Sequence, residues 1–161
     1  MTNSAAAELP YLERAVALAR RNLETGDGGP FGAVIVFNQQ IIGEGSNQVL
    51  RSHDPTAHAE VVAIRAASQA LSRFHLNGAT LYSSCEPCPM CLAAAHWAQI
   101  GHIVFAADRH DAAAAGFQDD DLYQLFERPG IASGMRRERR VLSEAQAVMR
   151  AWADLPGRKP Y

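Results

Sequence analysis

Four residues with the chemistry of a metal-dependent enzyme fall into two short motifs of this sequence. His58 and Glu60 form a His-x-Glu motif, and Cys88 and Cys91 form a Cys-x-x-Cys motif. Two thiolates at this spacing fit the first turn of a helix and can grip one ion, while the imidazole of His58 supplies a third ligand. Three protein ligands leave one position of a tetrahedral zinc ion open for water, which is the arrangement of a catalytic site. Glu60 is placed to handle protons beside that water.

The Cys-x-x-Cys motif alone is also typical of redox pairs and of structural zinc sites. A redox pair leaves the His-x-Glu motif unexplained. A closed structural site needs a fourth Cys or His, and the chain has no separate second Cys-x-x-Cys motif: Cys85 repeats the spacing but shares Cys88. The two motifs together therefore favour an open, catalytic zinc site. Cys85 precedes Cys88 closely, but we expect it to end a strand and to pack as a small hydrophobic residue.

The composition is that of an ordinary globular domain of 161 residues, with 48% hydrophobic and 20% charged residues. A formal net charge of −2 gives no general attraction for nucleic acid, which is not expected as a partner. All three cysteines lie within residues 85–91, which argues against a disulfide framework and indicates a reducing compartment. We see no signal peptide and no apolar run near the length of about 20 residues that spans a bilayer. We therefore expect a cytoplasmic protein that does not contact a membrane.

Hydrophobic periodicity and turn residues predict a single domain, residues 1–161, in which helices and strands alternate after a hairpin. This order indicates an α/β domain with a mixed sheet and helices on both faces. We expect Pro10 to open the first helix and Thr56 to cap the helix that begins at His58. The last residues, 153–161, are expected to be irregular. The expected helices are 10–23, 58–71, 89–99, 119–127 and 144–152, and the expected strands are 31–37, 41–47, 79–83, 102–106 and 135–142.

Several stretches resemble the zinc-dependent nucleobase deaminases of the cytidine-deaminase-like superfamily, and within it most of all the bacterial guanine deaminases. The resemblance implies a three-layer α/β/α fold with a mixed five-stranded sheet. It also implies a homodimer in which the tail 153–161, ending in Tyr161, covers an active site and is swapped onto the partner. The matching stretches are 28–34 (GGPFGAV), 54–60 (DPTAHAE), 85–91 (CEPCPMC), 111–117 (DAAAAGF) and the C-terminal 158–161 (RKPY).

The reaction implied by this resemblance is the hydrolytic deamination of guanine to xanthine and ammonia in purine catabolism. Zn²⁺ would be the cofactor, held by the His and Cys ligands of the two motifs, with Glu60 as the proton shuttle. The resemblance places Phe31 and Asn47 in the purine pocket, with Phe31 offering an aromatic face. Tyr161 would reach the substrate from the tail.

A further substrate contact is expected from Asp119. Guanine presents N–H donors at N1 and at its C2 amine, so a pocket that reads this edge needs a fixed acceptor, and an ionised carboxylate accepts only. Asp119 follows Gly116-Phe117, where the resemblance places the substrate-facing loop. Asp120 and Asp121 are interpreted as favourable charges at a helix N-terminus.

Other functions remain as alternatives. The zinc motifs are shared with tRNA adenosine deaminases and do not separate the two reactions. A deaminase of another small heterocycle, cytosine or a triazine, would use the same kind of pocket. A non-catalytic zinc module is a further alternative, but it would leave Glu60 without a purpose. The arginine-rich segment 136–140 is interpreted as an exposed edge and not as an RNA-binding surface.

Overall fold

A mixed sheet forms the centre of the protein, whose computed structural model describes residues 4–117, 122–124, 143–154 and 156–157. Strand β1 is antiparallel to both of its neighbours, β2 and β3, whereas β3 and β4 are parallel. The mixed sheet is thus as expected, but the described residues hold four strands instead of five. The fifth strand was expected at 135–142, which lies outside the described residues. The strands, in the spatial order β2-β1-β3-β4, are β2 (Gln40–Ser46), β1 (Gly32–Phe37), β3 (Thr80–Cys85) and β4 (His102–Ala107).

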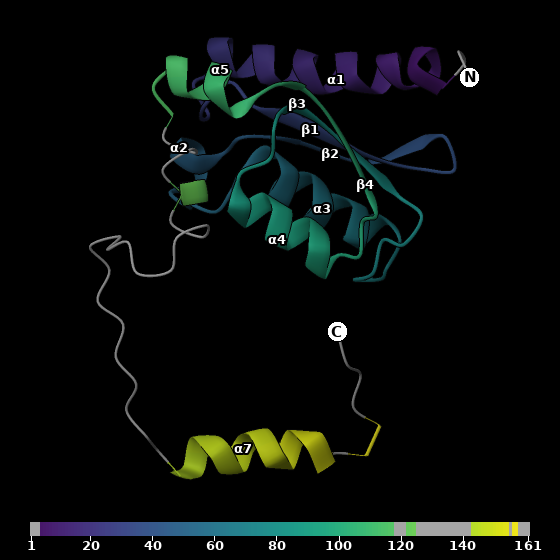
Figure 1. The fold of residues 1–161 in the computed structure, drawn as a ribbon, viewed down its shortest axis with the longest axis vertical. Coiled ribbons are helices and arrows are strands. Elements are labelled where there is room, and N and C mark those ends of the chain that lie inside the picture. The colour runs from purple at the N-terminus through teal and green to yellow at the C-terminus, as the bar shows by residue number, and fades with distance from the viewer. Residues whose placement is uncertain (1–3, 118–121, 125–142, 155, 158–161) are drawn as a thin grey trace.

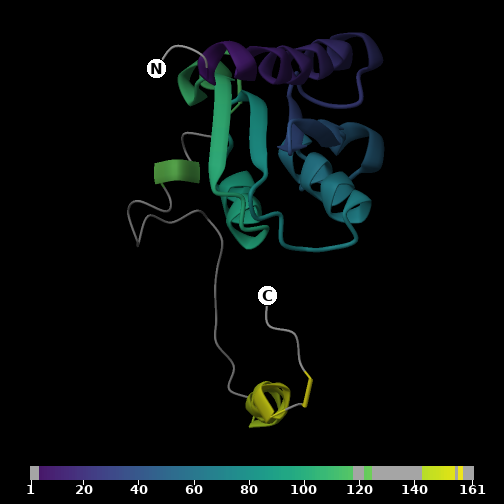
Figure 2. The same cartoon turned by 90° about the vertical axis from the view of Figure 1, so that its right-hand side faces the viewer.

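Helices cover both faces of this sheet, which gives the expected three layers (Figures 1 and 2). Helix α1 (Ser4–Thr25) runs along one face, and α3 (Ala59–Ala70) and α4 (Pro89–Trp97) lie on the other. The short helix α2 (Val49–Ser52) follows the hairpin, and α5 (Arg109–Ala114) follows β4. Helix α7 (Ser143–Asp154) is drawn apart from these layers in Figure 1.

Strand β1 is buried on both of its faces because it lies between the two helical layers. Val34 and Val36 pack with Leu18 of α1, whereas Ala33 and Ile35 belong to the core on the α3 and α4 side. Successive side chains of a strand point to opposite faces, so a run of apolar residues supplies both cores at once. The apolar run seen in the sequence is therefore a central strand.

Small residues let α3 approach the sheet closely. Ala59, Ala63 and Ala67 form one buried face of α3. Opposite them, a Cβ added at Gly45 would lie 2.2 Å from the Ala59 carbonyl oxygen, and one at Gly43 would lie 2.4 Å from that of Ala63. Neither distance leaves room for a side chain. The glycines of β2 therefore fix the position of α3, whose first turn carries part of the functional site.

Two expected helix starts were wrong. Helix α1 begins at Ser4, and Pro10 lies inside it. Pro10 lies beyond the first turn, so it removes one backbone donor from the helix, but the helix continues through it. Thr56 does not cap α3: its N–H and hydroxyl both donate to the Asp54 carboxylate, at 2.8 and 2.6 Å. His58 takes the N-cap position instead, without a capping side-chain hydrogen bond.

Two short helices, α2 and α5, were not predicted. Helix α5 begins after Asp108, whose carboxylate accepts from the backbone while Asp111 bonds back in a capping box. The last predicted helix is confirmed as α7, but it extends to Asp154, so the expectation of irregular structure was wrong at residues 153 and 154. Of the helix expected at 119–127, residues 122–124 are described and are helical. No helix in the described residues has the length and apolarity that a membrane span requires.

Candidate active site

The two sequence motifs meet where two helices begin. His58 is the N-cap residue of α3, and Cys88 is the N-cap residue of α4. Cys91 lies one turn into α4, and Pro89 suits the first position because its missing N–H would have no helical partner there. Helix N-termini carry unpaired N–H groups and the positive end of the helix dipole, which favour nearby thiolates. The local structure thus gathers and stabilises anionic ligands.

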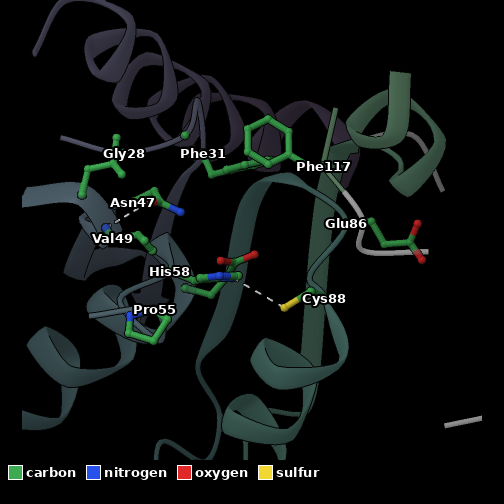
Figure 3. A pocket seen from close by; sticks show the side chains of 12 residues that line it. Gly28, Phe31, Asn47, Val49, Pro55, His58, Glu86, Cys88 and Phe117 are labelled. Carbon is green, nitrogen blue, oxygen red and sulfur yellow. Dashed lines mark hydrogen bonds between the residues drawn. The ribbon is translucent and has the colours of Figure 1, made fainter. Parts of the chain in front are cut away.

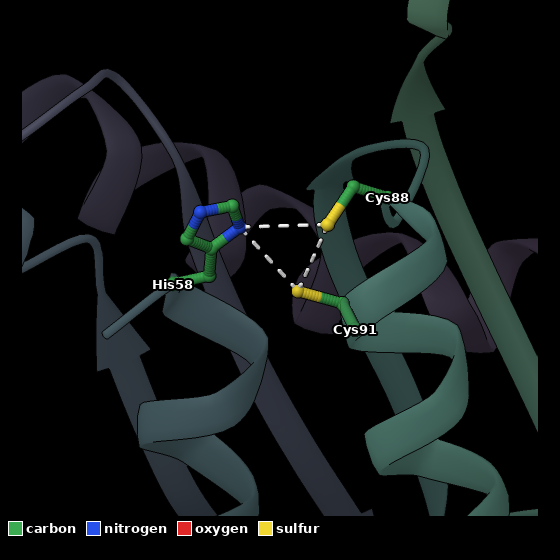
Figure 4. A group of neighbouring side chains, drawn as sticks. All are labelled: His58, Cys88 and Cys91. Atoms are coloured by element: carbon green, nitrogen blue, oxygen red, sulfur yellow. Dashed lines mark hydrogen bonds between the residues drawn. The ribbon is translucent and has the colours of Figure 1, made fainter. Parts of the chain in front are cut away.

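The ligand atoms of His58, Cys88 and Cys91 form a nearly equilateral triangle (Figure 4). The Nδ1 atom of His58 lies 3.6 Å from each sulfur, and the two sulfurs lie 3.6 Å apart. Zinc bonds of about 2.3 Å to sulfur and about 2.0–2.1 Å to nitrogen, at tetrahedral angles, require separations of about 3.6–3.8 Å. Both donor types and spacing therefore fit one zinc ion.

The two thiols differ in acidity. The hydrogen bond between the two sulfurs, together with His58, lowers the pKa of Cys88 to about 4. The same bond to Cys88 raises the pKa of Cys91, and burial adds to that rise. A cation bound among these atoms favours the thiolate form of both, because metal binding displaces ligand protons. Both sulfurs are therefore suited to bind a metal ion as thiolates.

Glu60 lies beside the ligand triangle and is almost completely buried, with 6% of its surface exposed. The hydroxyl of Ser83 donates to its Oε1 atom at 3.1 Å, and the thiol of Cys91 donates to its Oε2 atom at 3.4 Å. Burial in this site raises the pKa of the Glu60 carboxyl group, because desolvation disfavours the charged form. The carboxyl group is therefore suited to carry a proton close to the metal position.

A pocket of about 460 Å³ opens onto the site (Figure 3). This volume is in the range of small-molecule sites. His58, Glu60 and Cys88 contribute to its wall, so a bound molecule would touch the metal site and the carboxylate together. The other lining residues are Gly28, Gly29, Phe31, Asn47, Val49, Leu50, Pro55, Glu86 and Phe117.

Two aromatic rings form one part of the pocket wall. Phe31, expected there from the sequence, packs edge to face against Phe117, with ring centroids 4.7 Å apart. A Cβ at Gly29 would lie 2.9 Å from the Phe31 ring and 3.0 Å from that of Phe117, so a glycine is needed for this packing. The pair offers aromatic surface to a flat ligand.

Asn47, also expected in the pocket, is buried, and its side chain has a fixed direction. Its Oδ1 atom accepts from the Val49 N–H at 3.1 Å. The side-chain amide N–H₂ therefore remains as a donor on the other side of the group. Asn22 of α1 holds this region from behind, because its amide donates to the carbonyl oxygens of Gly29 and Asn47 at 2.8 and 2.7 Å.

The sequence analysis missed Ser83 and Asn22 as contributors to the site, and it placed Phe117 in the substrate-facing loop without giving its ring a role. Ser83 carried little signal, because Thr80, Tyr82 and Ser84 of the same strand are polar as well. Asn22 carried none, because its partners lie in other segments of the chain. Asp119 and Tyr161, both expected to contact substrate, lie outside the described residues. The segment after Asp119 is tied to the site by Tyr123, whose hydroxyl donates to the Pro87 carbonyl oxygen at 2.6 Å.

Comparison with known proteins agrees with this geometry. Residues 7–107 match the family described as "Cytidine and deoxycytidylate deaminase zinc-binding region". Guanine deaminase of Bacillus subtilis is 45% identical over 94% of this chain and 97% of its own length. A tRNA-specific adenosine deaminase of Buchnera aphidicola is 42% identical over 60% of this chain and 59% of its own length.

Solved structures match this chain as well. The crystal structure of the Bacillus subtilis guanine deaminase matches with a TM-score of 0.89, at 45% identity over 94% of this chain and 97% of that one. A guanine deaminase of Nitrosomonas europaea matches with a TM-score of 0.63, at 32% identity over 68% of this chain and 63% of that one. The fold, the zinc motifs and the extent of these matches show that the chain belongs to the zinc-binding cytidine and deoxycytidylate deaminase family.

Proposed function

We propose that the protein hydrolyses guanine to xanthine and ammonia in purine catabolism, with one zinc ion held by His58, Cys88 and Cys91. The observation that carries this proposal is that two of the three ligand residues, His58 and Cys88, and the Glu60 carboxylate border a pocket of about 460 Å³, which has room for a nucleobase. Guanine as the substrate is supported by the Bacillus subtilis guanine deaminase, whose similarity extends over 94% of the chain. A related solved structure, 33% identical with a TM-score of 0.63, contains 8-azaguanine.

Zinc in this site supplies a Lewis acid that lowers the pKa of a bound water and makes a nucleophile available near neutral pH. Glu60 carries the protons. Its raised pKa brings it closer to neutral pH, where a group can both take and give a proton. We propose that Glu60 takes a proton from the water and delivers it to the ring nitrogen beside C2. Once the water oxygen has bonded to C2, Glu60 takes the remaining proton of that oxygen and delivers it to the C2 amine, so that the C2–N bond breaks and ammonia and xanthine are formed.

The remaining pocket residues bind and orient the base. Phe31 and Phe117 provide the aromatic surface for the purine plane. The amide N–H₂ of Asn47 donates to an acceptor atom of the ring, because its Oδ1 is already held by Val49. Asp119 accepts from the donor edge of guanine, as expected from the sequence.

The runner-up function is the deamination of adenosine in tRNA, which the similarity to tRNA-specific adenosine deaminases favours. Adenine has no amine at C2, so it would leave a carboxylate acceptor of the pocket unpaired. A buried polar group without its partner costs about 1–3 kcal/mol. A pocket that binds the C2 amine of guanine therefore disfavours the adenine base of a tRNA.

A substrate panel tests the proposal. The purified zinc-loaded protein is incubated separately with guanine, adenine, cytosine and a tRNA, and the released ammonia is measured. We expect rapid release from guanine and at least about 10²-fold slower release from adenine and cytosine. Inosine formed in the tRNA, without xanthine formed from guanine, would assign the chain to the runner-up function.

We also propose that the protein is a single-domain cytoplasmic homodimer with a swapped C-terminal tail. The cytoplasm is supported by three free cysteines, two of them in the metal site. The dimer is supported by α7, which exposes three large apolar side chains: Val148, Met149 and Trp152. Such a face needs a partner surface. The fifth strand, 135–142, stays part of this proposal.

A further inference from the structure

Strand β3 carries two adjacent serines into the interior of the protein. Ser83 is 1% exposed and Ser84 is 8% exposed. Ser83 lies opposite Ala33 of β1, which belongs to the core on the α3 and α4 side. Because successive side chains alternate, Ser84 points to the α1 side of the sheet. The two hydroxyls are therefore matched in burial and strand position but face different layers.

The Ser83 hydroxyl has its hydrogen bond in the functional site. Its Oγ atom donates to Oε1 of Glu60 at 3.1 Å, from the middle of the sheet to the first turn of α3. A buried hydroxyl without a hydrogen-bond partner is costly. The bond is therefore expected to persist, and it ties one carboxylate oxygen to an inner strand of the sheet.

The second oxygen of Glu60 faces the metal ligands. Oε2 lies 3.4 Å from the sulfur of Cys91, while Glu60 also lines the pocket together with His58 and Cys88. With Oε1 held by the strand, rotation of the carboxylate about its last bond would break the Ser83 bond. The two oxygens thus have different surroundings: Oε1 is held by Ser83, and Oε2 lies beside the metal ligand Cys91.

We propose that Ser83 is a positioning residue, which holds the Glu60 carboxylate so that Oε2 is the oxygen that exchanges protons with water and substrate. This inference rests on the proposed function, in which Glu60 carries protons. In this proposal, the Ser83 hydroxyl of strand β3 determines the orientation of the Glu60 carboxylate. Misplacement of a catalytic group by about 1 Å can cost about 10²-fold in rate, so this orientation has a measurable effect.

Ser84 provides a matched control. Its Oγ atom accepts from the Gly32 N–H at 3.0 Å, and this bond joins β3 to β1 without contact to Glu60. Ser83→Ala and Ser84→Ala each delete one buried hydroxyl from the same strand. A purely structural role predicts similar effects of the two substitutions on stability and on turnover. A positioning role predicts that only Ser83→Ala slows turnover.

The experiment compares wild type, Ser83→Ala, Ser83→Thr and Ser84→Ala at equal zinc content, with kcat and KM measured for guanine. We expect kcat of Ser83→Ala to fall about 10- to 100-fold, with KM changed by less than about 3-fold. Ser83→Thr, which keeps the hydroxyl, should restore most of kcat, and Ser84→Ala should keep it. Wild-type kcat in Ser83→Ala, or equal losses in both alanine variants, would overturn the proposal.

A crystal structure of zinc-loaded Ser83→Ala gives a readout that does not depend on the substrate. We expect the Glu60 carboxylate to be rotated or to occupy more than one orientation, and an unchanged carboxylate would contradict the inference. If wild type releases no ammonia from guanine, the proposed function fails, whereas the structure still tests the positioning. If Ser83→Ala does not fold, Ser83→Cys, with a weak donor of similar size, takes its place in both measurements.

Discussion

The three cysteine thiols lie close in the sequence but point to two different places. Cys88 and Cys91 face His58, whereas the Cys85 thiol donates to the carbonyl oxygen of Asp108 at 3.4 Å. The separation follows from local structure, because Cys85 ends β3 and the other two begin α4. At the scale of single residues, therefore, the change from strand to helix selects which sulfurs can meet a metal.

Replacement of the ligands tests this selection. Cys91→Ala removes one corner of the triangle and should lose most of the zinc, together with some stability, because metal binding contributes to folding. Cys85→Ala serves as the control and should keep a full complement of zinc. Metal analysis of the purified variants checks both. Full zinc in Cys91→Ala, or none in Cys85→Ala, would show that the ligand set is wrong.

At the scale of elements, α1 supports the pocket without lining it. Asn22 is buried, and its amide joins the carbonyl oxygens of Gly29 and Asn47. Gly29 lies close in the sequence to Phe31 of the aromatic pair, and Asn47 carries the amide that we expect to donate to the purine. The Asn47 backbone is further tied to Phe31, since its N–H donates to the Phe31 carbonyl oxygen at 3.0 Å. Helix α1 therefore sets the distance between the two sides of the pocket.

Asn22→Ala should consequently affect substrate binding as well as stability. Two buried carbonyl groups lose a donor, at a cost to unfolding free energy of about 1–3 kcal/mol. We expect KM for guanine to rise about 10-fold, with a smaller change in kcat, because Asn47 loses its fixed position. Arg14→Ala is the control, since it removes the exposed α1–β2 ion pair with Glu44. Equal KM values for wild type and Asn22→Ala would exclude the supporting role.

The same elements show how far sequence reasoning reaches. The ligand residues were predictable because each motif is local and sits at a helix start, where spacing fixes geometry. The hairpin and the central strands were predictable from apolar runs. Ser83 and Asn22 were not, because their roles depend on partners brought close only by the sheet. Thr56 was misassigned for a local reason: the nearby Asp54 carboxylate competes for its hydroxyl.

At the scale of the whole molecule, the pocket and α7 both bear on whether two copies of the protein associate. The pocket opens to its surroundings beside the metal ligands, and α7 presents apolar side chains that include Met149, 70% exposed. A second copy that receives α7 and the tail would cover apolar surface and close the site together. Closure excludes water and strengthens the polar interactions of the site.

Truncation tests this arrangement. Deletion of residues 156–161 should reduce turnover of guanine strongly, while the zinc content and the thermal unfolding temperature stay close to those of wild type. Tyr161→Ala separates the last side chain from the rest of the tail and should share part of the loss. Steady-state kinetics and size-exclusion chromatography with light scattering measure both points. Full activity of the truncated protein would show that the tail has no part in the site.

The most direct test of the central claim compares zinc-loaded wild type with Glu60→Gln. Chromatography measures how fast each protein forms xanthine from guanine. Glutamine keeps the shape of Glu60 but cannot carry the proton. We predict that wild type converts guanine to xanthine, and that Glu60→Gln, at the same zinc content, is slower by about 10²- to 10⁴-fold. Absence of xanthine with wild type, or equal rates for the two proteins, would contradict the account.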